Sequence, residues 1–353
     1  MHFSPNYKHM LEVVNNKKPA RLPVYEHIIS TEIMEKILGV KFSEALEGDS
    51  ADCNYYFQNY CSFWKQMTYD TISYENCVMM SLPDHGAIFG GKGPIQNHQD
   101  YDRYPWEALE DIYWRDNEIR FTTFVDQIPE GMKAVGGIGN GPFEISEDLV
   151  GFESLAYLQS DDPELLSIIY DRIGDLLVAL WTRFLERYAD SFAICRIGDD
   201  LGFKTSTLIS PRAIRKYVIP QYKRVTQVFR KYNKPFLWHS CGKIFSIMDE
   251  MITLGINAKH SNEDQIAPYE EWINRYNDRI GLLGGIDVNT LCLNSPNEVF
   301  QQVFTKGSQF RNMTRGFALG SRNSIPEYVP VDCYLAMIEA AKAIRTKEME
   351  TIL

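Results

Sequence analysis

The sequence predicts an α/β fold, a single (β/α)8 TIM barrel that spans residues 1–353, with residues 1–20 as an N-terminal helical extension. Two observations predict it. Short apolar or β-branched runs alternate eight times with longer helical patterns, as in a parallel sheet covered by helices. No Pro-, Ser- or Gly-rich linker, charge block or low-complexity run divides the 353 residues, and α/β barrels of this length commonly form one unit.

Each of the eight runs ends at a turn and precedes a longer helical stretch. The expected strands are Leu22–Ile28, Thr71–Tyr74, Lys133–Ile138, Phe192–Ile197, Pro235–His239, Asn257–His260, Ile280–Gly284 and Gly316–Leu319. An open doubly wound sheet is the runner-up. It lacks support, because Glu26–His27–Ile28 stands at the end of the first run where a Gly-rich dinucleotide turn would be expected.

Helix-start signals mark four of the helices. Pro163–Tyr188 carries apolar residues at spacings of three and four, and Asp161–Asp162 precede it. Ser210 is a good N-cap before Pro211, and Asn294–Ser295–Pro296 opens another helix. Pro330 precedes the last expected helix, Asp332–Ile344.

Composition excludes several classes of protein. Hydrophobic residues make up 44% and charged residues 24%, which excludes disordered, collagenous and coiled-coil chains. The 47 acidic residues outnumber the 36 basic ones and give a formal charge of -11, whereas a nucleic-acid binder needs a concentrated basic face. We therefore expect no nucleic-acid partner.

Nothing in the sequence indicates a membrane or secretory route. No window approaches ~18 consecutive apolar residues, and the first residues lack the apolar core of a signal peptide. The seven cysteines are an odd number scattered through apolar or helical surroundings, which favours reduced thiols. We expect a cytoplasmic protein without membrane contact.

Ionisable residues follow nearly every expected strand. In barrels of this kind the chemistry gathers at the carboxyl ends of the strands, so this pattern predicts an enzyme with a small-molecule substrate. The residues at these ends are Glu26, His27, Glu75, Asp199, Asp200, His239, Cys241, His260 and Asp287.

The segment PFLWHSCGKI (235–244) carries the sharpest motif. Residues i and i+2 of a strand face the same side, so His239 and Cys241 should project together. Imidazole nitrogen and thiolate sulfur suit zinc, although a buried His beside an inert buried Cys is the alternative. The spacing names no third ligand.

The other strand ends leave more alternatives. Asp199 and Asp200 should point to opposite sides, so that one faces the pocket to bind metal or act as a base, while the other caps a turn. His260 is an acid, base or metal ligand, or else a structural histidine. Asp287 lines the pocket or caps the next helix. No G-x-S-x-G elbow supports acyl transfer through a serine.

Taken in order, the segments RLPVYEH, YDTISYE, GPFE, GDDLGFKTSTLISP, HSCGK, KHSNED, LLGGID and FALGSRNSIPEYVPVDCYLAMIEA resemble the uroporphyrinogen decarboxylase superfamily from about Arg21 to Ala341. The resemblance implies a (β/α)8 barrel. Its decarboxylase branch holds substrate carboxylates with an arginine-rich N-terminal segment. Here that region reads VYEHIIS (24–30), with no arginine and with Glu26 of the wrong sign.

The other branch contains zinc methyltransferases that move methyl groups between a corrinoid and a thiol. The resemblance makes His239 and Cys241 two of their three zinc ligands. Their third ligand is a cysteine after the last strand, where this sequence has Ser321. A carboxylate of Asp200, Glu26 or Glu75 could complete the site instead. The corrinoid would be carried by a partner protein.

We therefore expect a zinc-dependent methyltransferase that moves a methyl group between a small molecule and a corrinoid protein. The alternatives are a cofactor-independent decarboxylase and a non-catalytic ligand-binding barrel. The expected metal ligands are His239 and Cys241. The expected catalytic residues are Asp200, Asp199, His260, Glu26, His27 and Asp287. The expected substrate-binding residues are Glu75, Tyr25, Phe143, Ser321 and Asn323. The oligomeric state, the methyl donor and the acceptor stay open.

Overall fold

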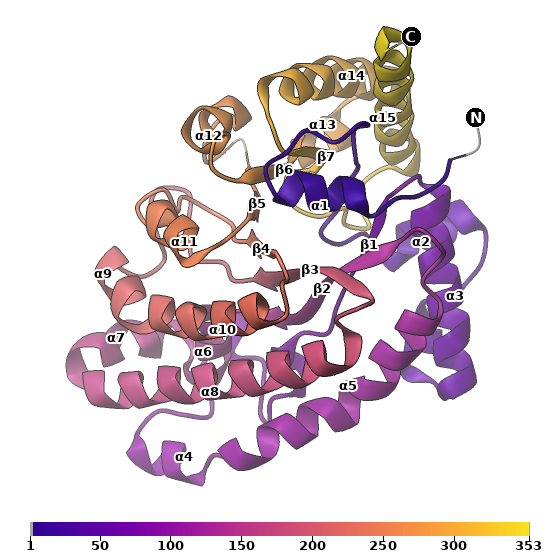
Figure 1. Cartoon of the computed structure of the whole chain (residues 1–353). Helices are drawn as coiled ribbons and strands as arrows, with labels where there is room; N and C mark the ends of the chain where they lie inside the picture. The colour runs from indigo at the N-terminus through magenta and orange to yellow at the C-terminus, as the bar shows by residue number, and fades with distance from the viewer. Residues whose placement is uncertain (1–2, 264, 353) are drawn as a thin grey trace.

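The computed structural model describes residues 3–263 and 265–352, which form a seven-stranded parallel sheet surrounded by helices (Figure 1). The sheet order is β1-β2-β3-β4-β5-β6-β7, so every strand lies beside its neighbour in the chain. The strands are β1 Thr71–Glu75, β2 Lys133–Asn140, β3 Phe192–Gly198, β4 Phe236–His239, β5 Ala258–His260, β6 Gly281–Ile286 and β7 Phe317–Ser321.

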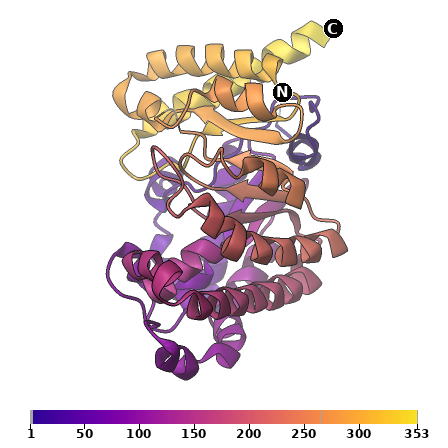
Figure 2. The same ribbon diagram turned by 90° about the vertical axis from the view of Figure 1, so that its left-hand side faces the viewer.

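Helices connect successive strands and cover the outside of the sheet. The α-helices are α1 Lys8–Val14, α2 Thr31–Leu38, α3 Ser50–Gln66, α4 His98–Arg103, α5 Leu109–Asp126, α6 Pro142–Val150, α7 Phe152–Asp161, α8 Pro163–Tyr188, α9 Pro211–Ala213, α10 Ile219–Lys231, α11 Met248–Leu254, α12 Tyr269–Tyr276, α13 Val288–Leu293, α14 Pro296–Met313 and α15 Val331–Ile352. Short 3-10 turns occur at Ser43–Glu47, Val78–Ser81, Ala87–Phe89 and Trp106–Ala108, and Ile214–Val218 is a π-turn. Figures 1 and 2 show the C-terminal helices α14 and α15 at one end of the molecule and helices α4, α5 and α8 towards the other.

The helix-start signals are confirmed. The Asp162 side chain accepts the backbone N–H of Leu165 at the start of α8, and Ser295 forms a capping box with Glu298 in α14. Ser210 caps the turn that begins at Pro211. The last helix begins at Val331, close to the expected Asp332, but extends to Ile352 rather than ending at Ile344.

The strand expected at Leu22–Ile28 is not formed. This segment makes a single parallel bridge between Val24 and Leu319 of β7, and Ile29 bridges Ile325 beyond it. Pro23 has no N–H to donate to a ladder, and the carbonyl oxygen of Glu26 accepts from the Ser73 hydroxyl of β1 instead of a backbone N–H. The expected eight-stranded sheet is thus seen as seven strands plus an extended segment that touches both edge strands.

The N-terminal helix closes the interior of the curled sheet at the start of the strands. Met10, Val13 and Val14 pack on a buried inner cluster that includes Val135, Ile194, Leu237, Leu283 and Ala318. A Cβ at Gly281 or Gly316 would lie 2.3 Å from the carbonyl oxygen of Val13, so these glycines let α1 approach closely. The N-terminal helix therefore covers the interior at the end where the strands begin.

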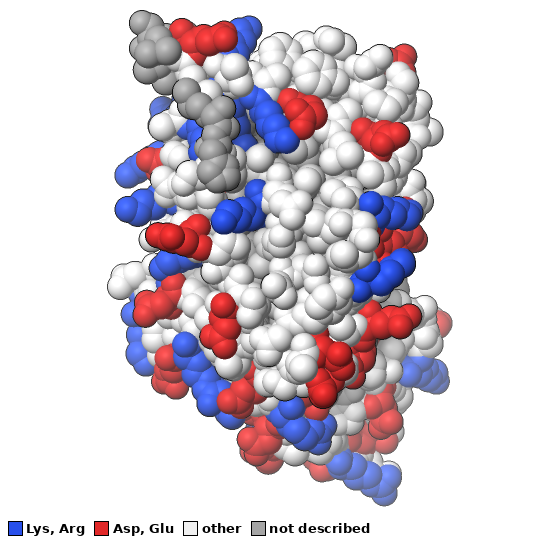
Figure 3. All heavy atoms as spheres, turned by 90° about the vertical axis from the view of Figure 1, so that its right-hand side faces the viewer, with Lys and Arg blue, Asp and Glu red and all other residues white. Residues whose placement is uncertain are grey.

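One face of the molecule carries charges of both signs. On the face shown in Figure 3, Lys and Arg are interspersed with Asp and Glu, and a broad band carries neither, so this face has no concentrated positive patch. Among the described helices, none combines the length and the apolar character needed to cross a membrane.

Candidate functional site

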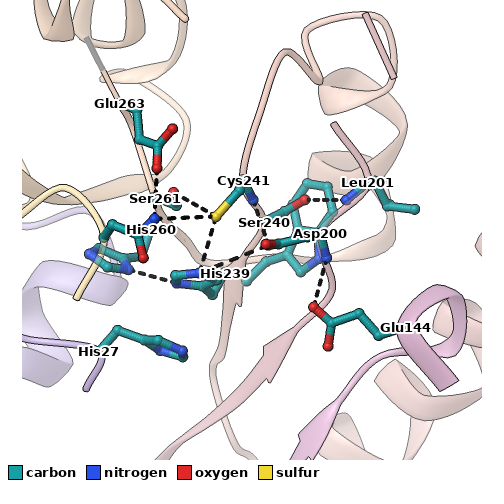
Figure 4. Close-up of polar contacts among 12 residues, drawn as sticks. His27, Glu144, Asp200, Leu201, His239, Ser240, Cys241, His260, Ser261 and Glu263 are labelled. Carbon is teal, nitrogen blue, oxygen red and sulfur yellow. Dashed lines mark hydrogen bonds and ion pairs between the residues drawn. The ribbon is translucent and has the colours of Figure 1, made fainter. Parts of the chain in front are cut away.

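The strand register brings two histidines together at the carboxyl end of the sheet. His239 ends β4, and His260 ends β5 as its partner in the parallel ladder. Their Nδ1 atoms are 2.9 Å apart (Figure 4). The Nε2 atom of His260 is 3.1 Å from the carbonyl oxygen of Ser321 at the end of β7.

These contacts determine which nitrogens carry protons. Burial lowers the pKa of His260 to about 3 and lowers that of His239 well below its usual value, so both rings are neutral. A carbonyl oxygen only accepts, so His260 Nε2–H donates to Ser321, which leaves a lone pair on His260 Nδ1. His239 Nδ1–H must then donate to that lone pair. The lone pair of His239 is therefore on Nε2.

The free nitrogen of His239 faces a thiol. Cys241 Sγ lies 3.6 Å from His239 Nε2 and accepts from the Ser261 hydroxyl at 3.2 Å. The side-chain amide of Asn323, from the loop after β7, donates to the same sulfur at 3.7 Å. Burial raises the pKa of the Cys241 thiol well above its usual value, and nearby Asp200 adds to this effect.

A backbone contact fixes the loops that follow β3 and β4. Gly242 has a φ of +81°, and a Cβ there would lie 2.1 Å from the carbonyl carbon of Gly202. A Cβ at Gly202 would in turn lie 2.7 Å from the carbonyl oxygen of Cys241. Only glycines allow this approach. It joins the loop that carries Asp200 to the loop that carries Cys241.

The two adjacent aspartates face different surroundings. Asp199 is fully buried and accepts from the backbone N–H groups of Phe143 and Glu144, at the start of α6, and from the Tyr222 hydroxyl at 2.8 Å. Asp200 accepts from the backbone N–H of Cys241 at 2.8 Å and lies 4.0 Å from His239 Nε2, with its side chain 44% exposed. Asp200 is therefore at the histidine–cysteine pair, whereas Asp199 holds α6.

Sequence analysis did not single out two carboxylates beside this aspartate pair. Glu144 accepts from the backbone N–H of Asp200 at 3.1 Å, and burial raises its pKa well above the usual value. Burial also raises the pKa of Glu147 to about 8 and that of Asp199 to about 7. Only Asp200 among these four is substantially exposed to water. The sequence signal that could have identified Glu144 is its place in GPFE, two residues after the proline that starts a helix.

The ring of His27 packs against one face of the His239 ring. The rings stack with centroids 3.9 Å apart, and His27 Nδ1 is buried without a hydrogen-bond partner in the described part of the chain. His27 Nε2 lies 3.8 Å from a Glu75 oxygen. Burial lowers the pKa of His27 well below its usual value, so this ring is neutral too.

The expected substrate-binding residues Glu75 and Tyr25 contact a buried arginine instead of an open pocket. Arg196 of β3 forms an ion pair with Glu75 at 2.8 Å and donates to the Tyr25 hydroxyl at 3.0 Å. Arg196 is 1% exposed, and the carboxylate of Glu75 balances its buried positive charge. A charged residue inside the apolar strand FAICRIG was the sequence signal for this pair.

Ser321 contacts Glu26 rather than Cys241. Its backbone N–H donates to one Glu26 oxygen at 2.7 Å and its hydroxyl donates to the other. Both side chains are fully buried, and burial raises the pKa of Glu26 to about 8. The Ser321 hydroxyl is thus bonded to Glu26, and two residues further along the loop the Asn323 amide contacts the Cys241 sulfur.

Three remaining residues take mainly structural positions. Asp287 caps α13 by accepting the backbone N–H of Asn289 at 2.7 Å. Phe143 is fully buried in the hydrophobic core. Lys259, which sequence analysis named only as part of a strand end, is buried and donates to the carbonyl oxygens of Ser240 (2.8 Å), Ser261 (2.7 Å) and His260. Lys259 thereby joins the ends of β4 and β5.

Two groups of potential metal ligands share His239. One consists of Asp200, His239 and Cys241, and the other of His27, His239 and His260, each with ligand atoms within 4.8 Å of one another. In the second group neither nitrogen of His260 has a lone pair to offer, because Nδ1 accepts the His239 proton and Nε2–H donates to Ser321. The first uses His239 Nε2, which has a free lone pair. The tautomers of His239 and His260 therefore favour Asp200, His239 and Cys241 as the ligands of a metal ion.

Comparisons with known proteins agree with this fold. A family model described as uroporphyrinogen decarboxylase (URO-D) matches residues 6–344. The solved structure of a methyltransferase from Methanosarcina mazei matches with a TM-score of 0.69 and 14% identity over 96% of this chain and 99% of that one. A broad-specificity GH5-4 endoglucanase from an uncultured bacterium matches with a TM-score of only 0.44 and 9% identity, over 90% of this chain and 97% of that one. No curated protein sequence matches the chain.

Proposed function

Because the chain belongs to the uroporphyrinogen decarboxylase family, we propose that it is a zinc-dependent methyltransferase that moves a methyl group between a small molecule and a corrinoid carried by a partner protein. One observation supports this most strongly. The neutral His239 presents an unprotonated Nε2 to the Cys241 thiol and the Asp200 carboxylate. We also propose that segment 22–28, which bridges to β7 and contacts β1, closes the seven strands into a barrel around this site.

The donor atoms fit zinc. Nitrogen, sulfur and oxygen from three side chains match the three-ligand sets of catalytic zinc sites, which keep a further position for substrate. His239, Cys241 and Asp200 would hold the ion. The Ser321–His260–His239 hydrogen bonds orient the imidazole, as the outer partners of metal-bound histidines do.

The zinc would supply one property, a lowered pKa of a bound thiol substrate. The residues of the chain provide the rest of the site. Asp200 is the group member most exposed to solvent, with a side chain 44% exposed, whereas His239 is 5% exposed. The stacked ring of His27 covers one face of His239, and the buried Tyr25 packs edge-on against His260.

A protein partner is supported by the loops around the site. Exposed apolar side chains stand on the connections that follow the extended N-terminal segment, β1, β3, β6 and β7: Ile28, Met80, Phe89, Phe203, Leu293 and Tyr328. Phe89 is 86% exposed. Apolar surface of this kind commonly marks a contact with another protein, here the carrier of the corrinoid.

The surroundings of the site disfavour decarboxylation of a polyanion. Binding several substrate carboxylates needs cationic groups with free donors. The described arginine nearest His27 is Arg196, which donates to Glu75, Tyr25 and the His27 carbonyl oxygen. Asp200 adds a partly exposed carboxylate at the carboxyl end of β3.

Metal content and methyl transfer test the proposal together. Protein purified without chelator should contain close to one zinc per chain and should demethylate methylcobalamin in the presence of 2-mercaptoethanol. The variant Cys241→Ala should lose most of the zinc and the activity, whereas Cys292→Ala, a cysteine in α13, should keep both. Full zinc content in Cys241→Ala would contradict the proposed ligand set. Release of CO₂ from uroporphyrinogen by the metal-free protein would replace methyl transfer with decarboxylation.

A further inference from the structure

A groove leads from the surface towards the Cys241 thiol. Its outer part, of 390 Å³, includes Thr290, Leu293 and Asn294 in its walls, and its inner part, of 220 Å³, includes Glu263, Arg322 and Asn323. Both parts share Gln265, Asp287 and Asn289 in their walls, so they adjoin each other. The groove thus joins the exposed Leu293 to the loop after β7.

The inner end of the groove lies one side chain away from the sulfur. The Asn323 side-chain amide donates to the Glu263 carboxylate at 2.7 Å and to Cys241 Sγ at 3.7 Å. A molecule in the groove that reaches past Asn323 would meet the thiol and the free nitrogen of His239.

The accessible walls of the groove carry negative charge and amides. Glu263 and Asp287 contribute carboxylates, and Gln265, Asn289 and Asn323 contribute amides. Arg322 also lines the inner part, but it is 2% exposed and its guanidinium lies over the Tyr269 ring at 5.2 Å. A ligand therefore meets the carboxylates and amides more readily than this cation.

We infer that this groove binds the protonated amine of a small aminothiol, whose thiol end is the methyl acceptor. The inference rests on the proposed function and specifies its substrate class. An ammonium group has three N–H donors and no acceptor, which suits carboxylate and amide oxygens. A thiol with a sulfonate or carboxylate at its other end would place like charges beside Glu263 and Asp287, which is unfavourable.

Three thiols with the same two-carbon spacing test the charge preference directly. Cysteamine ends in an ammonium group, 2-mercaptoethanol in a neutral hydroxyl and 2-mercaptoethanesulfonate in an anion. Calorimetric titration of the zinc-loaded and the zinc-free protein should rank cysteamine first and the sulfonate last in both forms.

Two variants test binding of the ammonium group separately from binding of the thiol. Asp287→Asn keeps a side-chain oxygen to cap α13, and Glu263→Gln keeps an acceptor for Asn323. Each should weaken cysteamine binding about two- to fivefold, the range of partly exposed ion pairs, and leave 2-mercaptoethanol binding unchanged. The control Asp49→Asn removes the charge of the N-cap of α3 and should change neither.

The outcomes distinguish this inference from the proposed function. Zinc-dependent binding of all three thiols with equal affinity, or a preference for the sulfonate, would overturn the aminothiol inference and leave methyl transfer standing. A cysteamine preference that Asp287→Asn and Glu263→Gln reduce, without any effect of zinc, would support the groove and contradict the zinc-thiol function. No binding of any of the three would overturn both.

Discussion

His239 and His260 meet through their Nδ1 atoms at 2.9 Å, and the Ser321 carbonyl oxygen on the far side of His260 determines which of them holds the proton between them. His260 is consequently a positioning residue for His239. It has no contact with Cys241 in the described structure, yet it makes His239 Nε2 available for a metal.

Replacement of His260 tests this relationship. His260→Leu removes the acceptor for His239 Nδ1–H and should weaken zinc binding about 10- to 100-fold, as loss of outer partners of metal-bound histidines does. His260→Gln offers an amide oxygen in the same region and should recover part of the affinity. Chelator competition measures both. The control His27→Leu removes the stacked ring but no hydrogen bond to His239, so an equal loss there would contradict the specific role of His260.

Two cysteine substitutions test where a second thiolate can join Cys241 at the proposed zinc site. Asn323→Cys should raise zinc affinity, because a thiolate binds zinc better than an amide and Asn323 already reaches the Cys241 sulfur. Ser321→Cys should not raise zinc affinity, because the Ser321 hydroxyl is buried and donates to the Glu26 carboxylate. Zinc titration of both variants checks the pair. A gain in Ser321→Cys alone would place Ser321 in the metal site after all.

The adjacent aspartates should respond differently to loss of charge. Asp199→Asn weakens the bonds to the start of α6 and to Tyr222, so it should lower the free energy of unfolding by about 1–2 kcal/mol. Asp200→Asn should leave stability nearly unchanged and lower zinc affinity. Urea denaturation and metal titration of each variant separate the two effects. Equal changes in both measurements would contradict the division of roles.

Glu26 should make stability depend on pH. Its pKa of about 8 in the folded protein exceeds the usual value of 4.5, so between these values the folded state keeps a proton that the unfolded state has lost. The contribution of Glu26 is therefore fully present below pH 4.5 and is lost as pH rises through 8, at up to about 1.4 kcal/mol per pH unit.

Glu26→Gln isolates this contribution. The amide can accept from the Ser321 N–H and donate to its hydroxyl, so the variant keeps the hydrogen bonds but does not titrate. The difference in unfolding free energy, wild type minus variant, should decline from pH 5 to pH 8 in urea denaturation series. A constant difference would mean that Glu26 is ionised in the folded protein.

Local patterns predicted most of the fold. Seven of the eight expected strands occur within the described residues, each within about two residues of its expected ends, because short β-branched runs lie between clear turn and helix signals. The segment 22–28 does not form the expected strand, because Pro23 has no backbone N–H to donate and the Glu26 carbonyl oxygen accepts from the Ser73 hydroxyl. That contact joins residues 47 positions apart, which no local pattern encodes.

The site was predicted less completely. The H-x-C spacing placed His239 and Cys241 together because residues i and i+2 share a face of a strand. The pairing of His239 with His260 depends on the register of β4 and β5, and no short turn fixes the register of parallel strands. The partners of Arg196, Lys259 and Ser321 depend on the same long-range packing.

At the proposed metal site, the backbone contact between Gly202 and Gly242 implies selection of the ion by its radius. Movement of one loop would displace the other, so this contact restricts how far the Asp200 carboxylate and the Cys241 sulfur can separate. An ion with longer bonds to sulfur, such as cadmium, would have to open this contact, whereas a smaller ion would not. The two glycines, which have no side chains to offer as ligands, would in this way help to decide which metal the protein retains.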